Sequence, residues 1–344
     1  MTGRSTIARL RAVAIVAGLA AAVGVLVVLQ VRPLLGGAPA PVRPWPVLPP
    51  ASARIDIGVT TVPLARNSWR RWQPQDLETV NVWEHLIRKH ASVVMWYSDW
   101  TTGAPSLLQL DAVADRGSVP EITWEPWRST TAVAAQPRFR LRNIIDGRFD
   151  PYIRSWARRL AAYARPVRLR FAHEMNGNWY PWSEHANGNG RGEFVLAWRH
   201  VHRIFDAAGA TNVRWIWGPA AINITRTQYP GDAYVDIVSL TTFNGGTQLR
   251  YARWRSLAAQ LARPLEQLHD IAPRKPIELS EVGCAEQGGN KAAWIAGMFP
   301  MLRRHPEITS VIWYDIVKGS DWRLASSKQA AEAFAAGVAD PRYR

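Results

Sequence analysis

Eight short apolar segments recur along the chain, and helical patterns fill much of the sequence between them. The segments are rich in β-branched and aromatic residues, which is typical of buried parallel strands. Helices are predicted at Tyr152–Tyr163 and Phe194–Ala207, where apolar residues recur with a 3.6-residue period. The strands are expected at Ile55–Val59, Val93–Tyr97, Glu121–Trp124, Val167–Phe171, Val213–Trp217, Ile237–Thr241, Pro276–Ser280 and Val311–Tyr314.

This alternation predicts an α/β fold, a (β/α)8 TIM barrel at residues 54–337 followed by a short tail at 338–344. An open, doubly wound parallel sheet is the alternative. It is less favoured because no glycine-rich phosphate loop follows the first predicted strand.

The N-terminal region has a different character. Ala12 to Val31 is 20 residues long and carries no charge, which is long enough to cross a bilayer as a helix. Three arginines precede it, which favours an N-terminus on the inner side. We predict a membrane anchor at 1–32, a proline-rich linker at 33–53 and an exported domain. A cleaved signal peptide, which would leave the domain secreted, is the alternative.

The composition describes a folded, strongly basic protein. Its hydrophobic content of 47% and charged content of 20% are typical of globular domains, and its net charge is +15. Such a charge favours an anionic partner, either an acidic polysaccharide or lipid headgroups. No nucleic-acid motif appears, so nucleic acid is not expected as a partner. A single cysteine, Cys284, excludes an intramolecular disulfide. Separately, we expect the protein to be a monomer.

Acidic and polar residues follow several of the predicted strands. In a TIM barrel these carboxyl ends surround the active site. Two of the acids, Glu174 and Glu281, follow the fourth and seventh strands, which face each other across the mouth. Two carboxyl groups about 5–5.5 Å apart perform retaining glycoside hydrolysis, whereas a gap of about 6.5–9.5 Å gives inversion. The other residues at these ends are Asp99, Glu125, Trp127, His173, Asn244 and Trp313.

The stretch RFAHEMNGNWYPW, residues 170–182, surrounds Glu174 with indole and amide groups. Trp179 and Trp182 can stack on the apolar faces of sugar rings, while His173 and Asn176 can bond their hydroxyl groups. A buried ion pair between Glu174 and Arg170 is the alternative interpretation. The motif lacks the second histidine of a zinc protease, and we predict neither a metal nor a cofactor.

Several stretches together resemble glycoside hydrolase family 26, best known for β-mannanases, with lichenases and β-1,3-xylanases among its members. They are ITWEPW, RFAHEMNGNWYPW, AWRHVHRIFDAAGATNVRWIWGP, YPGDAYVD, ELSEVGCAEQGGNKAAWI and DWRLASS, and they run from residue 122 to 327. The resemblance implies a TIM barrel and a retaining mechanism. It also implies that Glu174 is the acid/base, Glu281 the nucleophile, Trp179 a sugar platform and Trp313 the floor of the scissile subsite.

The chain departs from the family at a few positions. Phe243 stands where family mannanases have a tyrosine that touches the nucleophile, and Ala220 replaces an amide after the fifth strand. We count Phe243 and Asn244 among the substrate-binding residues, together with Glu125 and Trp127. Arg170 and Asp99 are expected to support the site.

Two functions remain open. The first is a retaining endo-β-glycoside hydrolase acting on a mannan-type or β-glucan-type polysaccharide. The anchor and the basic body suggest a bacterial exopolysaccharide as that substrate. The second is a non-catalytic glycan-binding or exopolysaccharide-assembly protein on the same barrel.

Overall fold

Eight parallel strands close into a barrel in the computed structural model, which describes residues 54–61, 77–131, 133–249 and 252–344. Consecutive strands pair in parallel around the barrel, and β1 pairs with β8 to close it. The prediction of a TIM-type barrel is confirmed. The strands are β1 (Asp56–Thr61), β2 (Val93–Asp99), β3 (Val119–Glu125), β4 (Val167–Phe171), β5 (Val213–Trp217), β6 (Ile237–Asn244), β7 (Ile277–Cys284) and β8 (Ile308–Asp315).

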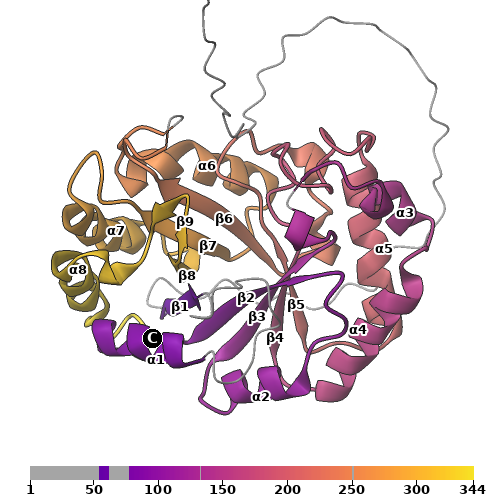
Figure 1. Cartoon of the computed structure of the whole chain (residues 1–344), viewed down its shortest axis with the longest axis horizontal. Coiled ribbons are helices and arrows are strands. Elements are labelled where there is room, and N and C mark those ends of the chain that lie inside the picture. Colours follow the sequence, from indigo (N-terminus) through magenta and orange to yellow (C-terminus); the bar gives the residue numbers. More distant parts are fainter. Residues whose placement is uncertain (1–53, 62–76, 132, 250–251) are drawn as a thin grey trace, which may run out of the picture. The chain divides into compact units, whose positions relative to one another are not determined.

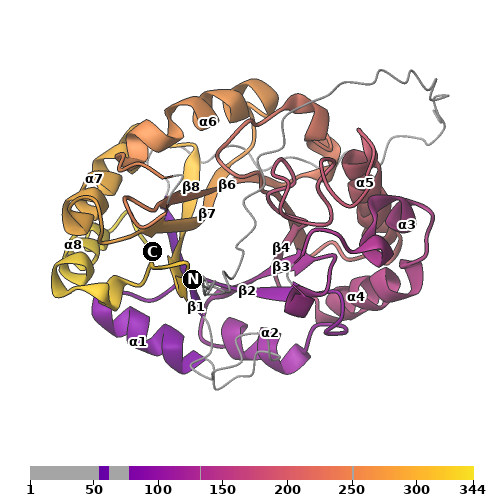
Figure 2. The ribbon, with the colours of Figure 1, turned by 45° about the horizontal axis from the view of Figure 1, so that its top comes forward.

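Helices surround the strands and cover their outer faces (Figure 1). They are α1 (Leu77–Ile87), α2 (Leu107–Ala114), α3 (Leu141–Ile145), α4 (Asp150–Tyr163), α5 (Glu193–Ala207), α6 (Leu257–Ile271), α7 (Lys291–Arg304) and α8 (Lys328–Val338). A small hairpin, β9 (Val317–Lys318) with β10 (Ser320–Asp321), follows β8. The short helix α3 belongs to the long connection from β3 to α4 and packs against α5 (Figure 2).

The connection from β5 to β6 departs from the predicted (β/α)8 pattern. Residues 218–236 are all described, and they form two 3₁₀ turns, η4 (Arg226–Gln228) and η5 (Asp232–Tyr234), rather than an α-helix. Pro219 and the pair Pro230-Gly231 explain the difference, because proline removes a helical hydrogen bond and fixes its own backbone angle.

Large aromatic side chains fill the layer between barrel and helices. Trp156 of α4 and Trp198 of α5 are fully buried there, so both are packing residues. The rings of Trp156 and Trp124 lie 4.6 Å apart between their centroids. Burial of such rings contributes about 1.5–3 kcal/mol each, so this layer stabilises the barrel while its interior carries polar groups.

The interior of the barrel holds charged side chains from β4 and β7. Arg168 and Arg170 are two residues apart on β4, so alternation places both on the same face. Glu278 and Glu281 are three apart on β7, and regular alternation would separate them. The pairing of β6 with β7 shifts register here, with Leu240 opposite Leu279 but Thr241 opposite Glu281. This bulge turns both glutamates towards the arginines of β4.

The residues predicted as a tail, 338–344, form part of the barrel unit. Tyr343 pairs in parallel with Ile55, and the amide of Ile55 donates to the carbonyl oxygen of Arg342 at 2.8 Å. The amide of Arg344 donates to the carbonyl oxygen of Ile55 at 2.9 Å. The predicted boundary at residue 337 is therefore wrong, because α8 runs through it and the last residues bind the start of β1.

The predicted membrane anchor at 1–32 and linker at 33–53 lie outside the described residues. Within the described part of the chain, no helix combines the length and the apolar character needed to span a bilayer.

Candidate active site

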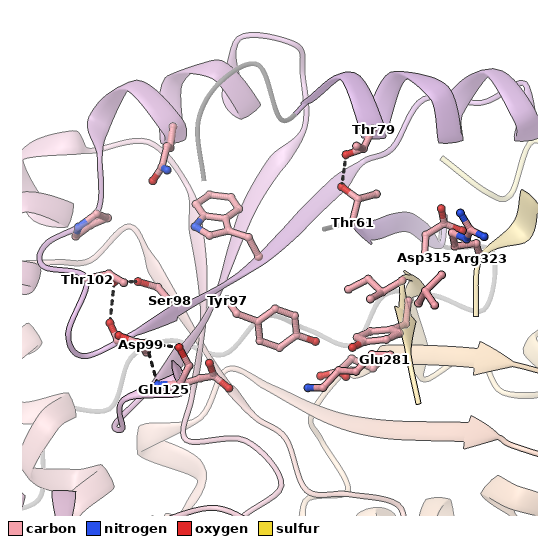
Figure 3. A pocket seen from close by; sticks show the side chains of 18 of the residues that line it. Thr61, Thr79, Tyr97, Ser98, Asp99, Thr102, Glu125, Glu281, Asp315 and Arg323 are labelled. Carbon is pink, nitrogen blue, oxygen red and sulfur yellow. Dashed lines mark hydrogen bonds between the residues drawn. The ribbon is translucent and has the colours of Figure 1, made fainter. Parts of the chain in front are cut away.

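A cavity of about 530 Å³ lies at the carboxyl ends of β2, β3, β7 and β8, where the sequence predicted a site. The figure shows its labelled side chains converging from opposite sides (Figure 3). Thr61 and Thr79 line one side of it. The residues that carry its polar chemistry are Tyr97, Asp99, Glu125, Tyr180, Glu281, Tyr314, Asp315 and Lys318.

Glu281 is held by an arginine from the opposite side of the barrel. Its carboxylate is only 5% exposed and forms an ion pair with the Nη2 of Arg170, which is fully buried. The Nε of Arg170 donates to Thr123 Oγ1 at 3.0 Å, which fixes the guanidinium in place. The alternative pairing of Arg170 with Glu174 is therefore wrong, because the arginine bonds the other glutamate.

Glu174 follows β4 in an unusual backbone conformation. Its φ of 53° lies in the left-handed region, which a residue with a side chain adopts at a cost. The amide of Glu174 donates to the carbonyl oxygen of Gly218 at 2.7 Å and so ties this turn to the end of β5. The indole Nε1 of Trp179 donates to the Oε2 of Glu174 at 2.8 Å.

The two glutamates interact electrostatically. Burial and, as the second cause, the negative charge of Glu281 raise the pKa of Glu174 to about 7. The hydrogen bond from Trp179 and the positive charge of Arg170 act in the opposite direction. The structure thus gives two carboxyl groups with different environments. One is paired with a guanidinium, and the other holds a proton up to about neutral pH.

A further carboxyl group, Glu125, lines the cavity together with Glu281, whereas Glu174 does not line it. Burial raises its pKa to about 8, against the effects of Trp127 and Lys318. A carboxyl group that stays neutral at pH 7 can donate a hydrogen bond as well as accept one. The predicted position of Glu125 and Trp127 at the site is supported, since both line the cavity.

Asp99 also lines the cavity, but its oxygens are already engaged. They accept hydrogen bonds from the amide of Thr101 at 2.8 Å and from the amide of Ser129 at 3.0 Å. The side-chain hydroxyl groups of the same two residues also donate to them. Asp99 therefore joins the loop after β2 to the loop after β3. This agrees with its predicted supporting role.

Three tyrosines at the site were missed by the sequence analysis. Tyr97, Tyr180 and Tyr314 all line the cavity, and burial raises the pKa of each phenol. The charge of Glu281 contributes to all three increases. The available signal was position, since Tyr97 shares a strand face with Asp99, and Tyr180 lies within the quoted motif.

Two predicted tryptophans belong to the core instead. Trp313 is fully buried; its ring lies 5.4 Å from that of Phe334 in α8, and its Nε1 donates to the carbonyl oxygen of Trp322 at 3.1 Å. The adjacent residue, Tyr314, faces the cavity. Trp182 is also fully buried and donates to the carbonyl oxygen of His173 at 2.6 Å. The predicted sugar contacts of Trp313 and Trp182 are therefore wrong.

The predicted amides serve the loops around the cavity. Asn176 donates to the carbonyl oxygens of Ala220 and Ile222 and accepts from the amide of Ala220 at 2.9 Å. Asn244 is fully buried and contacts Cys284 Sγ at 3.6 Å. Both side chains hold backbone segments together, so their prediction as substrate-binding residues is corrected.

Phe243 and His173 lie next to the cavity without lining it. The ring of Phe243 packs at 5.0 Å from Tyr314 and 4.9 Å from Trp322. His173 is 1% exposed, its ring lies 4.8 Å from that of Tyr180, and burial lowers its pKa well below the usual value. Both rings pack behind Tyr314 and Tyr180, and their predicted sugar contacts stay predictions.

Buried polar atoms without a partner gather around Glu281. In the described residues, no hydrogen-bond partner is present for Tyr97 Oη, Arg170 Nη1 or His173 Nδ1. Buried polar groups normally find partners, and each unpaired one costs about 1–3 kcal/mol. Two of these atoms are hydrogen-bond donors, so the site suits a ligand rich in oxygen acceptors.

Comparison with known proteins identifies relatives of this barrel. A family model described as glycosyl hydrolase family 26 matches residues 123–273. Endoglucanase H of Acetivibrio thermocellus is 33% identical over 290 residues, which is 80% of this chain and 31% of that protein. The β-1,3-xylanase TXYA of a Vibrio species is 27% identical over 175 residues, which is 49% of this chain and 36% of that protein. The chain thus spans about a third of the length of these curated relatives.

Solved structures agree with the fold. A family 26 β-mannanase from Bacteroides ovatus superimposes with a TM-score of 0.64 at 16% identity, covering 85% of this chain and 90% of the other. The Bacillus subtilis mannanase man26 gives a TM-score of 0.58 at 18% identity, covering 84% and 86%. At such identities the likeness shows the barrel fold alone.

Proposed function

Because the chain belongs to glycoside hydrolase family 26, we propose that it is a retaining endo-β-glycoside hydrolase with Glu174 as acid/base and Glu281 as nucleophile. The observation that carries this proposal is the contrast between the two carboxyl groups. Glu281 is paired with Arg170, whereas Glu174 has a pKa of about 7 and interacts with the charge of Glu281. One group can attack as a carboxylate while the other donates a proton.

In the first step, a carboxylate oxygen of Glu281 attacks the anomeric carbon of the sugar in the cavity. The glycosidic bond breaks, and Glu174 gives its proton to the leaving oxygen. The product of this step is a glycosyl ester of Glu281. In the second step Glu174, now ionised, takes a proton from water, and the hydroxide oxygen bonds to the anomeric carbon. Glu281 leaves as a carboxylate, and two inversions give net retention.

Arg170 and Trp179 prepare the two glutamates for these steps. The guanidinium of Arg170 keeps Glu281 oriented and compensates its charge in a buried place. Trp179 is 42% exposed and donates to Glu174, so its indole can bond the acid and offer a face to a sugar ring. Tyr314 and Trp127 supply further aromatic surface in the cavity.

The proposed substrate class is a β-linked polysaccharide of mannan or β-glucan type. The relatives are named for the hydrolysis of such polymers, as an endoglucanase, a β-1,3-xylanase and a mannan endo-1,4-β-mannosidase. We further propose that the domain acts outside the cytoplasm, held by the predicted anchor at 1–32. A bacterial exopolysaccharide is the substrate that such a location favours.

The full-length protein, incubated with mannan, mixed-linkage β-glucan and β-1,3-xylan, tests this proposal by product sizing. We expect internal cleavage of at least one polymer. Glu174→Gln and Glu281→Gln should each abolish cleavage while polymer binding persists. Binding by the unmodified protein without any cleavage would support the non-catalytic alternative and contradict the enzyme.

A further inference from the structure

The long connection from β3 to α4, together with α4 itself, carries an unusual concentration of positive charge. Between Arg128 and Arg165 the chain holds nine arginines and only two aspartates, Asp146 and Asp150. The fold separates these arginines into those on or just after the outer helix α4 and those on the connection from β3 to α4.

Four exposed arginines lie on loops that leave the carboxyl ends of β3 and β4. We call Arg128, Arg138, Arg140 and Arg191 the basic rim. Arg128 directly follows Trp127, which lines the cavity, so the rim begins at the cavity edge.

The two loops of the basic rim are bonded to each other. Asn187 Nδ2 donates to the carbonyl oxygen of Gln136 at 2.9 Å, and the amide of Leu141 donates to Asn189 Oδ1 at 2.9 Å. A Cβ added at Gly188 would lie 3.4 Å from the Cζ of Arg140, so this guanidinium rests on the loop after β4. The rim is therefore a continuous surface built from both loops.

The acids nearest in sequence do not neutralise the rim. Glu184 accepts hydrogen bonds from the amides of Gly192 and Phe194, and Glu193 pairs with Arg142 at 2.9 Å. Among the described residues, no ion pair joins any of the four rim arginines to an acid. Like charges gathered without partners produce a local positive potential that attracts anions.

The cavity beside the rim has the opposite character. Asp99, Glu125, Glu281 and Asp315 all line it, against Lys318 and Arg323. A carboxylate on the sugar at the cleavage point would face Glu281 at close range, and two like charges there are unfavourable. A carboxylate on a neighbouring sugar, by contrast, would lie near guanidinium groups, which bind carboxylates through paired hydrogen bonds.

We propose that the basic rim binds the carboxylate groups of an acidic β-linked polysaccharide, while an uncharged sugar of the same polymer occupies the cavity. The inference rests on the proposed function and names the substrate class for that site. It assigns the rim a role in binding and no part in bond cleavage.

Two polymers with the same backbone linkage provide the test. Partially C6-oxidised β-1,4-mannan carries carboxylates on some of its sugars and leaves others neutral, and unmodified β-1,4-mannan carries none. Binding of each is measured by affinity electrophoresis with the full-length Glu281→Gln protein, which removes turnover. We expect the oxidised mannan to bind about tenfold more tightly than mannan at low salt, because only the oxidised polymer offers carboxylates to the rim arginines.

The rim variant R128Q/R138Q/R140Q/R191Q should lose this preference. The matched control, R158Q/R203Q/R263Q/R304Q, removes the same charge from exposed arginines of α4, α5, α6 and α7 and should keep it. Equal binding of the two polymers, or equal losses in both variants, would overturn the inference. Since binding needs no cleavage, it can succeed while the hydrolysis experiment fails, and the reverse also holds.

Discussion

Arg168 and Arg170 stand two residues apart on β4, and each meets a glutamate of β7 inside the barrel. Arg168 lies towards the amino ends of the strands and is closely surrounded. It donates to Glu278 at 2.7 Å, to Asp56 at 2.7 Å and to Ser310 at 3.0 Å. Arg170 lies towards the carboxyl ends and donates to Glu281 and Thr123, while its Nη1 has no partner among the described residues.

The comparison shows that β4 carries one arginine that stabilises the barrel, Arg168, and one that serves the site, Arg170. The floor cluster of Arg168, Asp56 and Glu278 also receives Arg344 from the chain end, so these charged groups pair with one another. At the mouth, Arg170 keeps a free donor beside the unpaired hydroxyl of Tyr97. Buried donors left unpaired in this way lower stability and raise the benefit of binding an oxygen-rich ligand.

The largest expected effect is the difference in activity between variants of the two glutamates of β7, Glu281 at the mouth and Glu278 at the floor. Glu281→Gln should lower kcat/KM by at least about 10³-fold, because a retaining enzyme cannot form its ester without the carboxylate. Glu278→Gln should keep activity within a few fold but lower stability by about 1–3 kcal/mol, since a charged partner of Arg168 is lost. Kinetics and urea unfolding check both. Equal losses of activity in the two variants would remove the distinction between mouth and floor.

Replacing Arg168 tests the floor by itself. Arg168→Met leaves Glu278 buried without its counter-charge and Asp56 with Arg344 alone, and should lower the free energy of unfolding by about 3–5 kcal/mol. Arg154→Met removes an exposed pair with Asp150 on α4 and should cost no more than about 0.5 kcal/mol. Urea unfolding measures both values. A loss below about 1 kcal/mol for Arg168→Met would show that the floor cluster does not stabilise the fold.

The pH dependence tests the mouth. Hydrolysis needs Glu174 protonated, and its pKa is about 7, so kcat/KM should be maintained below pH 7 and fall about tenfold per unit above it. Trp179→Phe removes a hydrogen bond that favours the ionised form and should move this alkaline limb to higher pH. The profile is measured at polymer concentrations well below KM, where the rate reports kcat/KM. A limb that stays in place, or moves to lower pH, contradicts the assignment of Glu174 as the acid.

The smallest expected effect concerns Tyr97, whose hydroxyl has no partner in the described structure. Tyr97→Phe should leave stability unchanged or slightly higher, while KM rises several-fold through loss of about 1 kcal/mol of hydrogen bonding to substrate. Tyr343→Phe removes a buried hydroxyl at the floor and serves as the control, with KM unchanged. An unchanged KM in both variants would show that Tyr97 does not reach the sugar.

Much of the fold could be predicted because its signals are local. Eight strand positions and two helices follow from apolar patterns, and the family resemblance that the comparisons confirm depends on contiguous motifs. The missing helix between β5 and β6 and the role of residues 338–344 were not predicted. The missing helix depends on where prolines interrupt the connection from β5 to β6. The role of residues 338–344 depends on their pairing with the start of β1, which is distant in sequence.

The site was predicted less completely because side-chain direction depends on strand register. Trp313 and Tyr314 are neighbours, and a shift of one residue decides which of them faces the cavity and which faces α8. The bulge of β7 similarly brings Glu278 and Glu281 into one interior against regular alternation. Such irregularities arise from pairing between distant strands, which single-sequence patterns do not contain.

The anomeric configuration of the first product tests the central claim most directly. Proton NMR, recorded during cleavage of a β-linked polymer by the full-length protein, observes the new reducing end before mutarotation. We predict that the β-anomer appears first, because Glu281 forms a covalent ester that water then displaces. Initial release of the α-anomer would contradict the account, since it would mean direct attack by water.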